Sequence, residues 1–327
     1  MRPSRLPVLA LALLAIGLPA HAQAPPGKVF RVGITQIVSH PVLDAQRTAF
    51  IDELKKEGFE EGKNIRYDVQ VAQNDATLSK TIAEKFAADR VDLILTLSTP
   101  SMQAAVRATR DSGIPVVFVA VTDPVSAGVL ASVDRPSGTH VTGVYNFDPV
   151  EAQMELAREL RPGLKTLGVI YNAGESNSVA NVKLLKTVAQ KFGWSLVEAT
   201  VTSTAEVRTA AQSLVGRTDA VYMPTDNTVM AGLEALLRVA QEAKLPLVTG
   251  DVSSVQRGAL GAVGDDPEDK GRQAATLAVR VLRGTKPGDV KPEMVRKRLL
   301  YLNRTTARAI GITLPDGLVQ RAAKVFD

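Results

Sequence analysis

The residues most able to do chemistry lie in short polar segments that follow apolar runs. Six such segments are rich in hydroxyl, amide and carboxylate groups: 35–41, 98–101, 122–124, 172–178, 225–227 and 250–251. None of the six contains Lys or Arg, which a phosphate or sulfate site would normally recruit. Several lead directly into predicted helices, whose free N–H groups attract a carboxylate. The sequence therefore predicts a site for a small zwitterion, with a carboxylate at one end and an amine at the other.

Each end of such a ligand has candidate partners in these segments. We expect Ser98 and Thr99, with the helix N-terminus that follows, to hold the carboxylate. Asp226 or Glu175 would hold the amine, and the other candidate binding residues are Gln36, His40, Thr122, Asp123, Tyr145, Asn177, Asn227 and Asp251. Of these, Gln36, Asn177 and Thr122 would set the orientation of the ligand. The same residue types are preferred helix N-caps, so capping remains open as the role of any single one.

The chain has no recognisable catalytic or metal-binding pattern. His21 falls in the N-terminal segment, His140 lies near a glycine turn, and His40 stands alone beside the predicted site. No grouping of His, Asp and Glu has the spacing of metal ligands, and no G-x-G-x-x-G opens a helix after a strand. Residues 174–178 lack the final glycine of a nucleophile elbow. We therefore predict a binding protein, with no cofactor, no metal and no catalytic residues.

The elements that must position the polar segments occur twice. Over 30–124, and again over 165–251, apolar strands alternate with helices, and the two copies lie roughly 130 residues apart, about one domain length. This alternation predicts parallel sheets with helices on both faces, and ligands bind beyond the carboxyl ends of such strands. We expect an α/β fold of two Rossmann-like lobes that close around a small molecule.

The last part of the chain must be shared between the lobes. Further strands are expected at 259–263 and 298–302, with a helix at 270–282 between them. We predict one lobe from 28–146 plus 252–288, and a second lobe from 147–251 plus 289–327. The chain would then cross between the lobes three times, and such a multi-strand hinge permits closure on a ligand.

Residues 1–22 have the character of a secretory signal peptide. Arg2 and Arg5 precede an apolar run at 6–18, and small residues flank His21, which predicts cleavage before Gln23. A membrane anchor is the alternative, but the run is shorter than the roughly 20 residues that a spanning helix needs. The chain has no cysteine, so it has neither disulfides nor a cysteine-linked lipid. We expect a free protein in the periplasm of a two-membrane cell.

Charge gives no indication of a nucleic-acid partner. The formal net charge of +5 falls to +3 once Arg2 and Arg5 leave with the signal peptide, and the remaining Lys and Arg are scattered. A nucleic-acid-binding surface would show a basic stripe or patch, so we expect no such partner.

Several of these segments resemble one known family. Residues 33–41, 121–124, 169–178 and 224–228, together with 271–273 and 310–313, resemble the ABC transporter substrate-binding proteins of the TrpX type. The resemblance covers essentially the whole exported chain. It implies a type I periplasmic binding protein fold, and delivery of an amino acid, often aromatic, to an ABC permease in the inner membrane. The stretch 265–270 departs from the family pattern, in which a tyrosine or other apolar residues are common.

The leading hypothesis is thus a monomeric periplasmic binding protein of an ABC importer. A periplasmic sensor that presents its ligand to a membrane receptor or kinase would use the same clamp, and that alternative stays open. A transcriptional regulator would need an N-terminal helix-turn-helix, where this chain has an export segment. A secreted enzyme would need a catalytic constellation that the sequence lacks.

Overall fold

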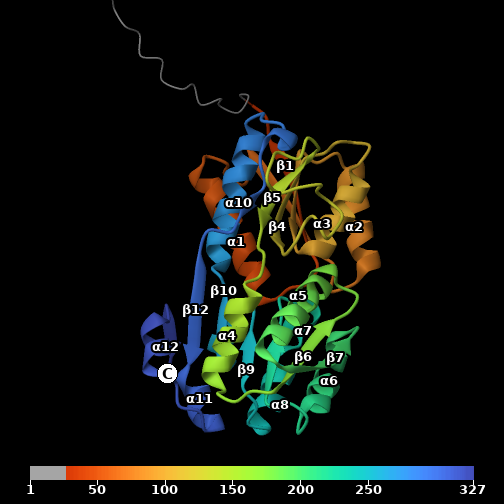
Figure 1. The fold of residues 1–327 in the computed structure, drawn as a ribbon. Coiled ribbons are helices and arrows are strands. Elements are labelled where there is room, and N and C mark those ends of the chain that lie inside the picture. Colours follow the sequence, from red (N-terminus) through yellow and green to blue (C-terminus); the bar gives the residue numbers. More distant parts are fainter. Residues whose placement is uncertain (1–26) are drawn as a thin grey trace, which may run out of the picture.

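Two α/β lobes lie end to end in the structure, a computed structural model that describes residues 27–327 (Figure 1). Each lobe is built on one sheet, and the chain passes between the lobes near residues 146–149, 266 and 295–297. The predicted fold class is confirmed. The predicted signal peptide lies outside the described residues.

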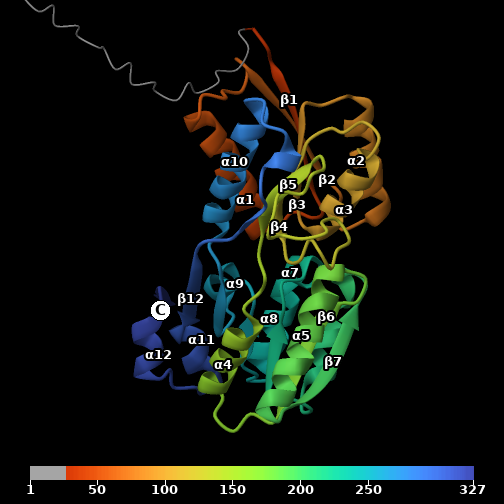
Figure 2. The same cartoon turned by 45° about the horizontal axis from the view of Figure 1, so that its top comes forward.

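The first lobe contains a six-stranded sheet within the described range, in the order β11-β5-β4-β3-β1-β2 with every pair parallel. Its strands are β1 (Phe30–Gln36), β2 (Ile65–Val71), β3 (Leu93–Leu97), β4 (Val116–Val121), β5 (Val141–Tyr145) and β11 (Glu293–Met294). Its helices are α1 (Pro41–Lys56), α2 (Ala76–Ala88), α3 (Thr99–Ala108), α10 (Pro267–Leu282) and the short η2 (Pro287–Asp289). Helices α1 and α10 pack together on one face of the sheet, and α2 and α3 pack on the other (Figure 2).

The second lobe contains a seven-stranded sheet among the described residues, in the order β13-β12-β10-β9-β8-β6-β7. Its strands are β6 (Thr166–Asn172), β7 (Ser195–Val201), β8 (Ala220–Met223), β9 (Leu247–Thr249), β10 (Gly261–Asp265), β12 (Arg298–Asn303) and β13 (Lys324–Phe326). Its helices are α4 (Val150–Leu160), α5 (Ser176–Phe192), η1 (Thr204–Glu206), α6 (Val207–Leu214), α7 (Asn227–Ala231), α8 (Leu233–Glu242), α9 (Ser253–Arg257), α11 (Arg304–Ile310) and α12 (Asp316–Arg321). Helices α4 and α5 pack together, as do α6 and α8.

The predicted repeat is confirmed by strand order. The first copy forms β4-β3-β1-β2 and the second forms β9-β8-β6-β7, which is the same arrangement. Every residue of the central strand β3 is buried, as expected when helices cover both faces of a parallel sheet. Because the strands of both copies end at the interface between the lobes, their polar end segments face one another there.

The sheets correct two predicted boundaries. Strand β10 pairs with β9 in the second sheet, so the second crossing follows β10 at residue 266 and not residue 251. Strand β11 pairs with β5 in the first sheet, so the third crossing falls at 295–297 and not at 288. Strand β12 also departs from the predicted parallel order and runs antiparallel to β10. The reason is the path of the chain: β10 leaves the second lobe, and β12 enters it again from the first.

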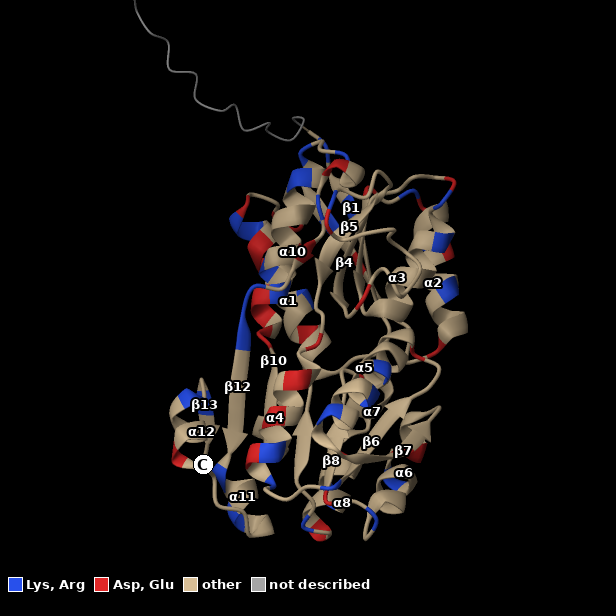
Figure 3. Ribbon diagram, viewed as in Figure 1, with Lys and Arg blue, Asp and Glu red and all other residues tan. Residues whose placement is uncertain are grey.

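Figure 3 shows Lys and Arg mixed with Asp and Glu over the outer helices of both lobes. This agrees with the scattered charge seen in the sequence. Within residues 27–327, no helix combines the length and apolar character needed to cross a bilayer.

Candidate functional site

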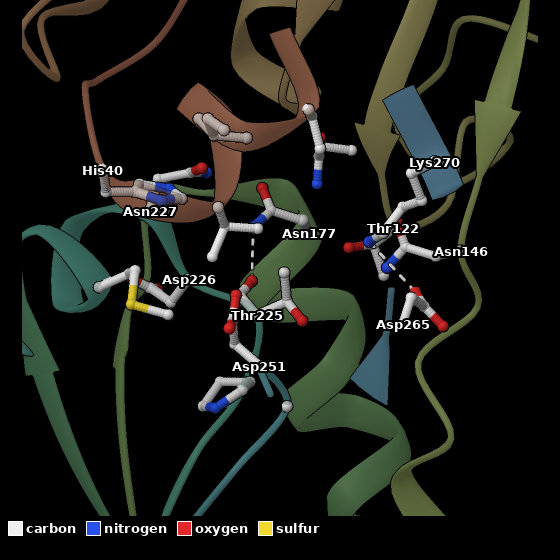
Figure 4. A pocket seen from close by; sticks show the side chains of 17 residues that line it. His40, Thr122, Asn146, Asn177, Thr225, Asp226, Asn227, Asp251, Asp265 and Lys270 are labelled. Atoms are coloured by element: carbon white, nitrogen blue, oxygen red, sulfur yellow. Dashed lines mark hydrogen bonds and ion pairs between the residues drawn. The ribbon is translucent and has the colours of Figure 1, made fainter. Parts of the chain in front are cut away.

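A pocket lies between the lobes, at the ends of the strands (Figure 4). It holds about 600 Å³ of space free of protein atoms, part of it open to solvent. Its walls come from both lobes and from the crossing segments: His40, Val42, Leu43, Gln46, Ala120, Thr122, Asn146, Asn177, Pro224, Thr225, Asp226, Asn227, Met230, Gly250, Asp251, Asp265 and Lys270.

Several buried polar atoms in this wall lack a hydrogen-bond partner among the described residues. They are His40 Nδ1, Gln46 Nε2 and Oε1, Asn146 Oδ1, Asn177 Oδ1 and Asp265 Oδ1. An unsatisfied buried polar group costs roughly 1–3 kcal/mol, so a folded protein normally pairs such groups. A polar ligand that enters this pocket would meet all of these groups.

His40 is the predicted residue that reaches this pocket from the first lobe at the start of α1. It occupies the N-cap position before Pro41, but its side chain makes no capping bond to the helix. Burial lowers the pKa of the imidazole, and the nearby carboxylates Asp251 and Asp44 oppose that shift. The side chain also hydrogen-bonds to Asn227 of the facing lobe, while its buried Nδ1 has no partner among the described residues.

Two predicted carboxylates, Asp226 and Glu175, are engaged within the second lobe. Asp226 caps α7 by accepting from the Val229 N–H at 2.7 Å, and its other oxygen accepts from the Asn172 N–H and the Ser178 hydroxyl, both at 2.6 Å. Burial, followed by the neighbouring Glu175, raises the pKa of Asp226 to about 7. Asp226 lines the pocket, but its oxygens already accept these three bonds.

Glu175 does not line the pocket. Its carboxylate accepts from the backbone N–H groups of Asn227 and Thr228 at 3.2 and 3.0 Å, and from the Thr228 hydroxyl at 2.8 Å. The amide groups of Asn177 and Asn227 also donate to it. Glu175 thus fixes the N-terminus of α7, which is the capping role that the sequence left open.

Ser98 and Thr99 lie at the start of α3 and are buried, but they are outside the pocket wall. The hydroxyl of Ser98 faces that of Ser101 at 3.4 Å. The structure therefore does not bring this helix N-terminus to the pocket as the sequence predicted. Helix α3 packs with α2 on one face of the sheet, whereas α1 and α10, which bring His40 and Lys270 to the pocket, pack on the other face (Figure 2).

Three other predicted residues also lie away from the pocket wall. Gln36 accepts from Arg47 at 2.7 Å and donates to Asp44 at 2.9 Å, which fixes the loop that carries His40. Asp123 caps its own turn through the backbone N–H groups at 125 and 126. Tyr145 packs edge-on against Phe147 in the first crossing. The predicted residues that the structure does bring together are His40, Thr122, Asn177, Asp226, Asn227 and Asp251.

The main feature missed from sequence is a buried ion pair at the second crossing. Asp265 ends β10 and Lys270 lies in the first turns of α10, with Lys270 Nζ 3.2 Å from Asp265 Oδ2. Their side chains are only 3% and 8% exposed. The departure of 265–270 from the family pattern was the signal that could have found them. Gln46 and Asn146 were also missed, because nothing in their local sequence marks them as facing a pocket.

Two lobes with a polar pocket between facing strand ends are the arrangement of type I periplasmic binding proteins, as predicted. The chain belongs to the ABC transporter substrate binding protein family, whose model matches residues 31–326. It is 40% identical over 279 residues to the tyrosine-binding protein of Clostridioides difficile, which covers 85% of this chain and 80% of that relative.

Solved structures agree with this assignment. A conserved domain protein from Vibrio cholerae has a TM-score of 0.89 at 38% identity, and covers 91% of this chain and 100% of its own. An ABC domain from Streptococcus in complex with L-Trp scores 0.87 at 30% identity, with the same coverage. A ligand-free, open substrate binding protein from Clostridium difficile scores 0.68 at 39% identity, covering 91% of this chain and 99% of its own.

Proposed function

We propose that this chain is the periplasmic binding component of an ABC importer, and that it captures an aromatic amino acid between its lobes for an inner-membrane permease. Residues 1–22 would direct export and be removed before Gln23, and the exported protein would act as a monomer. The observation that carries the proposal is the set of buried polar atoms without partners in the pocket wall. The names of the relatives, a tyrosine-binding protein and a complex with L-Trp, point to the ligand class.

The arrangement of the lobes supports this proposal. The TM-score to the L-Trp complex, 0.87, is higher than the TM-score to the open, ligand-free protein, 0.68. The sequence identities run the other way, at 30% and 39%. Two contacts within the chain also join the lobes: Val42 of α1 packs into an apolar cluster of the second lobe, and Asn74 donates to Thr228 across the cleft. We therefore infer that the structure is the closed form, in which a ligand would be enclosed.

The pocket wall also suits an aromatic side chain. Val42, Leu43, Pro224 and Met230 provide apolar surface beside the polar groups. Burial of a large ring against such residues contributes several kcal/mol to binding, whereas the polar groups fix orientation. This mixed apolar and polar lining favours an aromatic amino acid over a fully polar solute.

Thermal unfolding of the purified, ligand-stripped protein against the twenty amino acids tests the proposal. A ligand at about 100 times its dissociation constant adds roughly 2.7 kcal/mol of stability, which corresponds to a rise of about 5 °C in Tm. We expect such a rise with L-Tyr or L-Trp and none with glycine. If no aromatic amino acid raises the Tm, the proposed ligand class is wrong.

The variant Gln46→Leu sharpens this test, because Gln46 has two unpartnered polar atoms and is fully buried. Leucine of similar size removes that cost, so the protein without ligand should be at least as stable as the wild type. The same change should weaken ligand binding. A variant that loses stability and keeps full affinity would show that Gln46 serves the fold and not the ligand.

A further inference from the structure

We propose that the buried pair Asp265 and Lys270 recognises both charged groups of the ligand, with Lys270 holding the α-carboxylate and Asp265 the α-ammonium. This inference depends on the proposed function and gives it a mechanism. Asp265 and Lys270 flank the second crossing between the lobes, so the ligand would bind directly at the hinge.

The burial of this pair calls for a functional reason. Removing two charges from water costs more than an average ion pair returns, and apolar replacements for buried pairs are often as stable. Here Asp265 Oδ1 has no hydrogen-bond partner among the described residues, and the nearest guanidinium, that of Arg298, is 3.8 Å away. A pair that leaves an oxygen unsatisfied is poorly suited to stabilise the fold, but well suited to bind a cation.

The charges in the pocket wall assign the α-carboxylate of the ligand to Lys270. Among the described residues that line the pocket, Lys270 is the one lysine or arginine. A lysine ammonium has three N–H donors, and the contact to Asp265 leaves others for a ligand. A carboxylate that enters this pocket therefore finds its opposite charge at Lys270.

A comparison of the three carboxylates in the pocket wall assigns the α-ammonium of the ligand to Asp265. Both oxygens of Asp226 accept bonds within the second lobe, and the raised pKa of Asp226 reduces its negative charge near neutral pH. Asp251 Oδ1 accepts from the Ser253 N–H at 2.7 Å. Of the three, only Asp265 presents a buried oxygen that lacks a hydrogen-bond partner within the described chain.

The spacing of the pair selects an α-amino acid. In such a ligand the ammonium nitrogen and the carboxyl carbon are bonded to the same atom, and they lie about 2.5 Å apart by covalent geometry. Asp265 and Lys270 present opposite charges 3.2 Å apart. The ammonium of the ligand can therefore face Asp265 while its carboxylate faces Lys270. A β- or ω-amino acid separates its charges further and fits this arrangement less well.

This position of the head group also orients the side chain. Figure 4 shows Lys270 and Asp265 at one side of the pocket, and His40 and Asn227 at the other. Met230, Val42 and Leu43 also line the pocket. The ligand ring would therefore extend from the hinge toward His40, whose buried Nδ1 lacks a partner in the described structure.

Calorimetry with matched ligands tests the inference. The probes are L-tyrosine, tyramine, which lacks the carboxylate, and 3-(4-hydroxyphenyl)propionate, which lacks the ammonium. We expect Lys270→Met to weaken L-tyrosine about 10- to 100-fold, the range for a bond to a charged group, and to leave tyramine within threefold of wild type. Asp265→Asn should weaken L-tyrosine similarly and spare the propionate. L-tryptophan, tryptamine and indole-3-propionate replace this series if tryptophan binds more tightly.

Two further variants control for folding and for general charge effects. Lys297→Met removes a lysine that contacts Asp266 in the same hinge but does not line the pocket, so it should leave all affinities within threefold. The double variant Asp265→Asn with Lys270→Met removes both members of the pair together, so neither keeps its charge without the other. It should fold, and it should lose the preference for L-tyrosine over both analogues.

The outcomes separate the two proposals. If the wild-type protein binds neither L-tyrosine nor L-tryptophan, the proposed function fails before any variant is made. If it binds one of them, but Lys270→Met leaves that affinity unchanged or weakens the amino acid and the amine equally, the head-group assignment alone is overturned. The same conclusion follows if the double variant retains the full preference for the zwitterion.

Discussion

A hydrogen bond outside the pocket predicts how lobe closure sets affinity. The loop between β2 and α2 carries Asn74, whose side-chain amide donates to the Thr228 hydroxyl of α7 across the cleft at 2.8 Å. The backbone of Asn74 is left-handed, with φ of 64°, and its N–H donates to Ile37 O at 2.7 Å. We choose Asn74→Gly, because glycine accepts this backbone conformation and retains the N–H bond while the amide is removed.

The expected magnitude follows from what remains at Thr228. Its hydroxyl still accepts from Asn172 and donates to Glu175, both at 2.8 Å, so no buried group in the second lobe is left unsatisfied. The variant therefore loses one neutral hydrogen bond, worth about 0.5–1.5 kcal/mol, and only in the closed form. When the free protein is mostly open, this whole loss appears in the dissociation constant, as a weakening of about 2- to 12-fold.

Stopped-flow fluorescence and calorimetry with the best amino-acid ligand measure this effect. We expect faster ligand dissociation and an unchanged association rate, because the bond forms after the ligand has entered. Gln73→Gly is the matched control: Gln73 is exposed and also left-handed, with φ of 51°, in the same loop. An Asn74→Gly variant with the affinity and dissociation rate of Gln73→Gly would refute the assignment of this bond to closure.

Two further predictions concern stability. Burial raises the pKa of Asp226 from 3.8 to about 7, so the folded state holds the carboxyl proton more tightly than the unfolded state does. The free energy of unfolding should therefore fall as pH rises from about 4 to 7, by at most about 1.4 kcal/mol per pH unit. Denaturant unfolding at several pH values should show that Asp226→Asn lacks this fall. If the unfolding free energies of wild type and variant change with pH in parallel, the raised pKa of Asp226 is wrong. Gly271→Ala should cost about 1–3 kcal/mol, because its Cβ would collide with the Gln46 carbonyl and lie 2.9 Å from Ala49 Cβ on α1. Gly317→Ala in α12 meets open space and should not destabilise, so equal losses in both would contradict the packing argument.

Local patterns in the sequence determined the strands, helices and repeat. Continuous apolar runs such as 93–97 become buried parallel strands because helices must cover both faces of such a sheet. The repeat then places the polar strand ends of both copies at one interface, so the location of the cleft also follows from the sequence. His40, Thr122 and Asn177 were predicted on this basis and do line the pocket.

Local patterns could not decide which polar residues serve the fold and which face the ligand. Glu175 and Asp226 have the same chemistry, and both follow strand ends of the second lobe. Glu175 nevertheless fixes the N-terminus of α7 and lies outside the wall, whereas Asp226 lines it. Ser98 and Thr99 were equally plausible and are also outside it. Side-chain direction at a strand end depends on the backbone of neighbouring loops, and the sequence does not encode that locally.

The Asp265–Lys270 pair shows most clearly what only the tertiary structure decided. Strand β10 joins the second sheet through hydrogen bonds to β9 and β12, whereas α10 packs on α1 of the first lobe. That division places residues 265–270 across the hinge and buries two charges beside the pocket. The sequence alone determined two lobes and a polar cleft, because short-range apolar patterns specify strands and helices. Long-range strand and helix pairing decided which groups in that cleft remain free for a ligand. Such pairing fixes where the chain crosses between the lobes and which polar atoms already have hydrogen-bond partners.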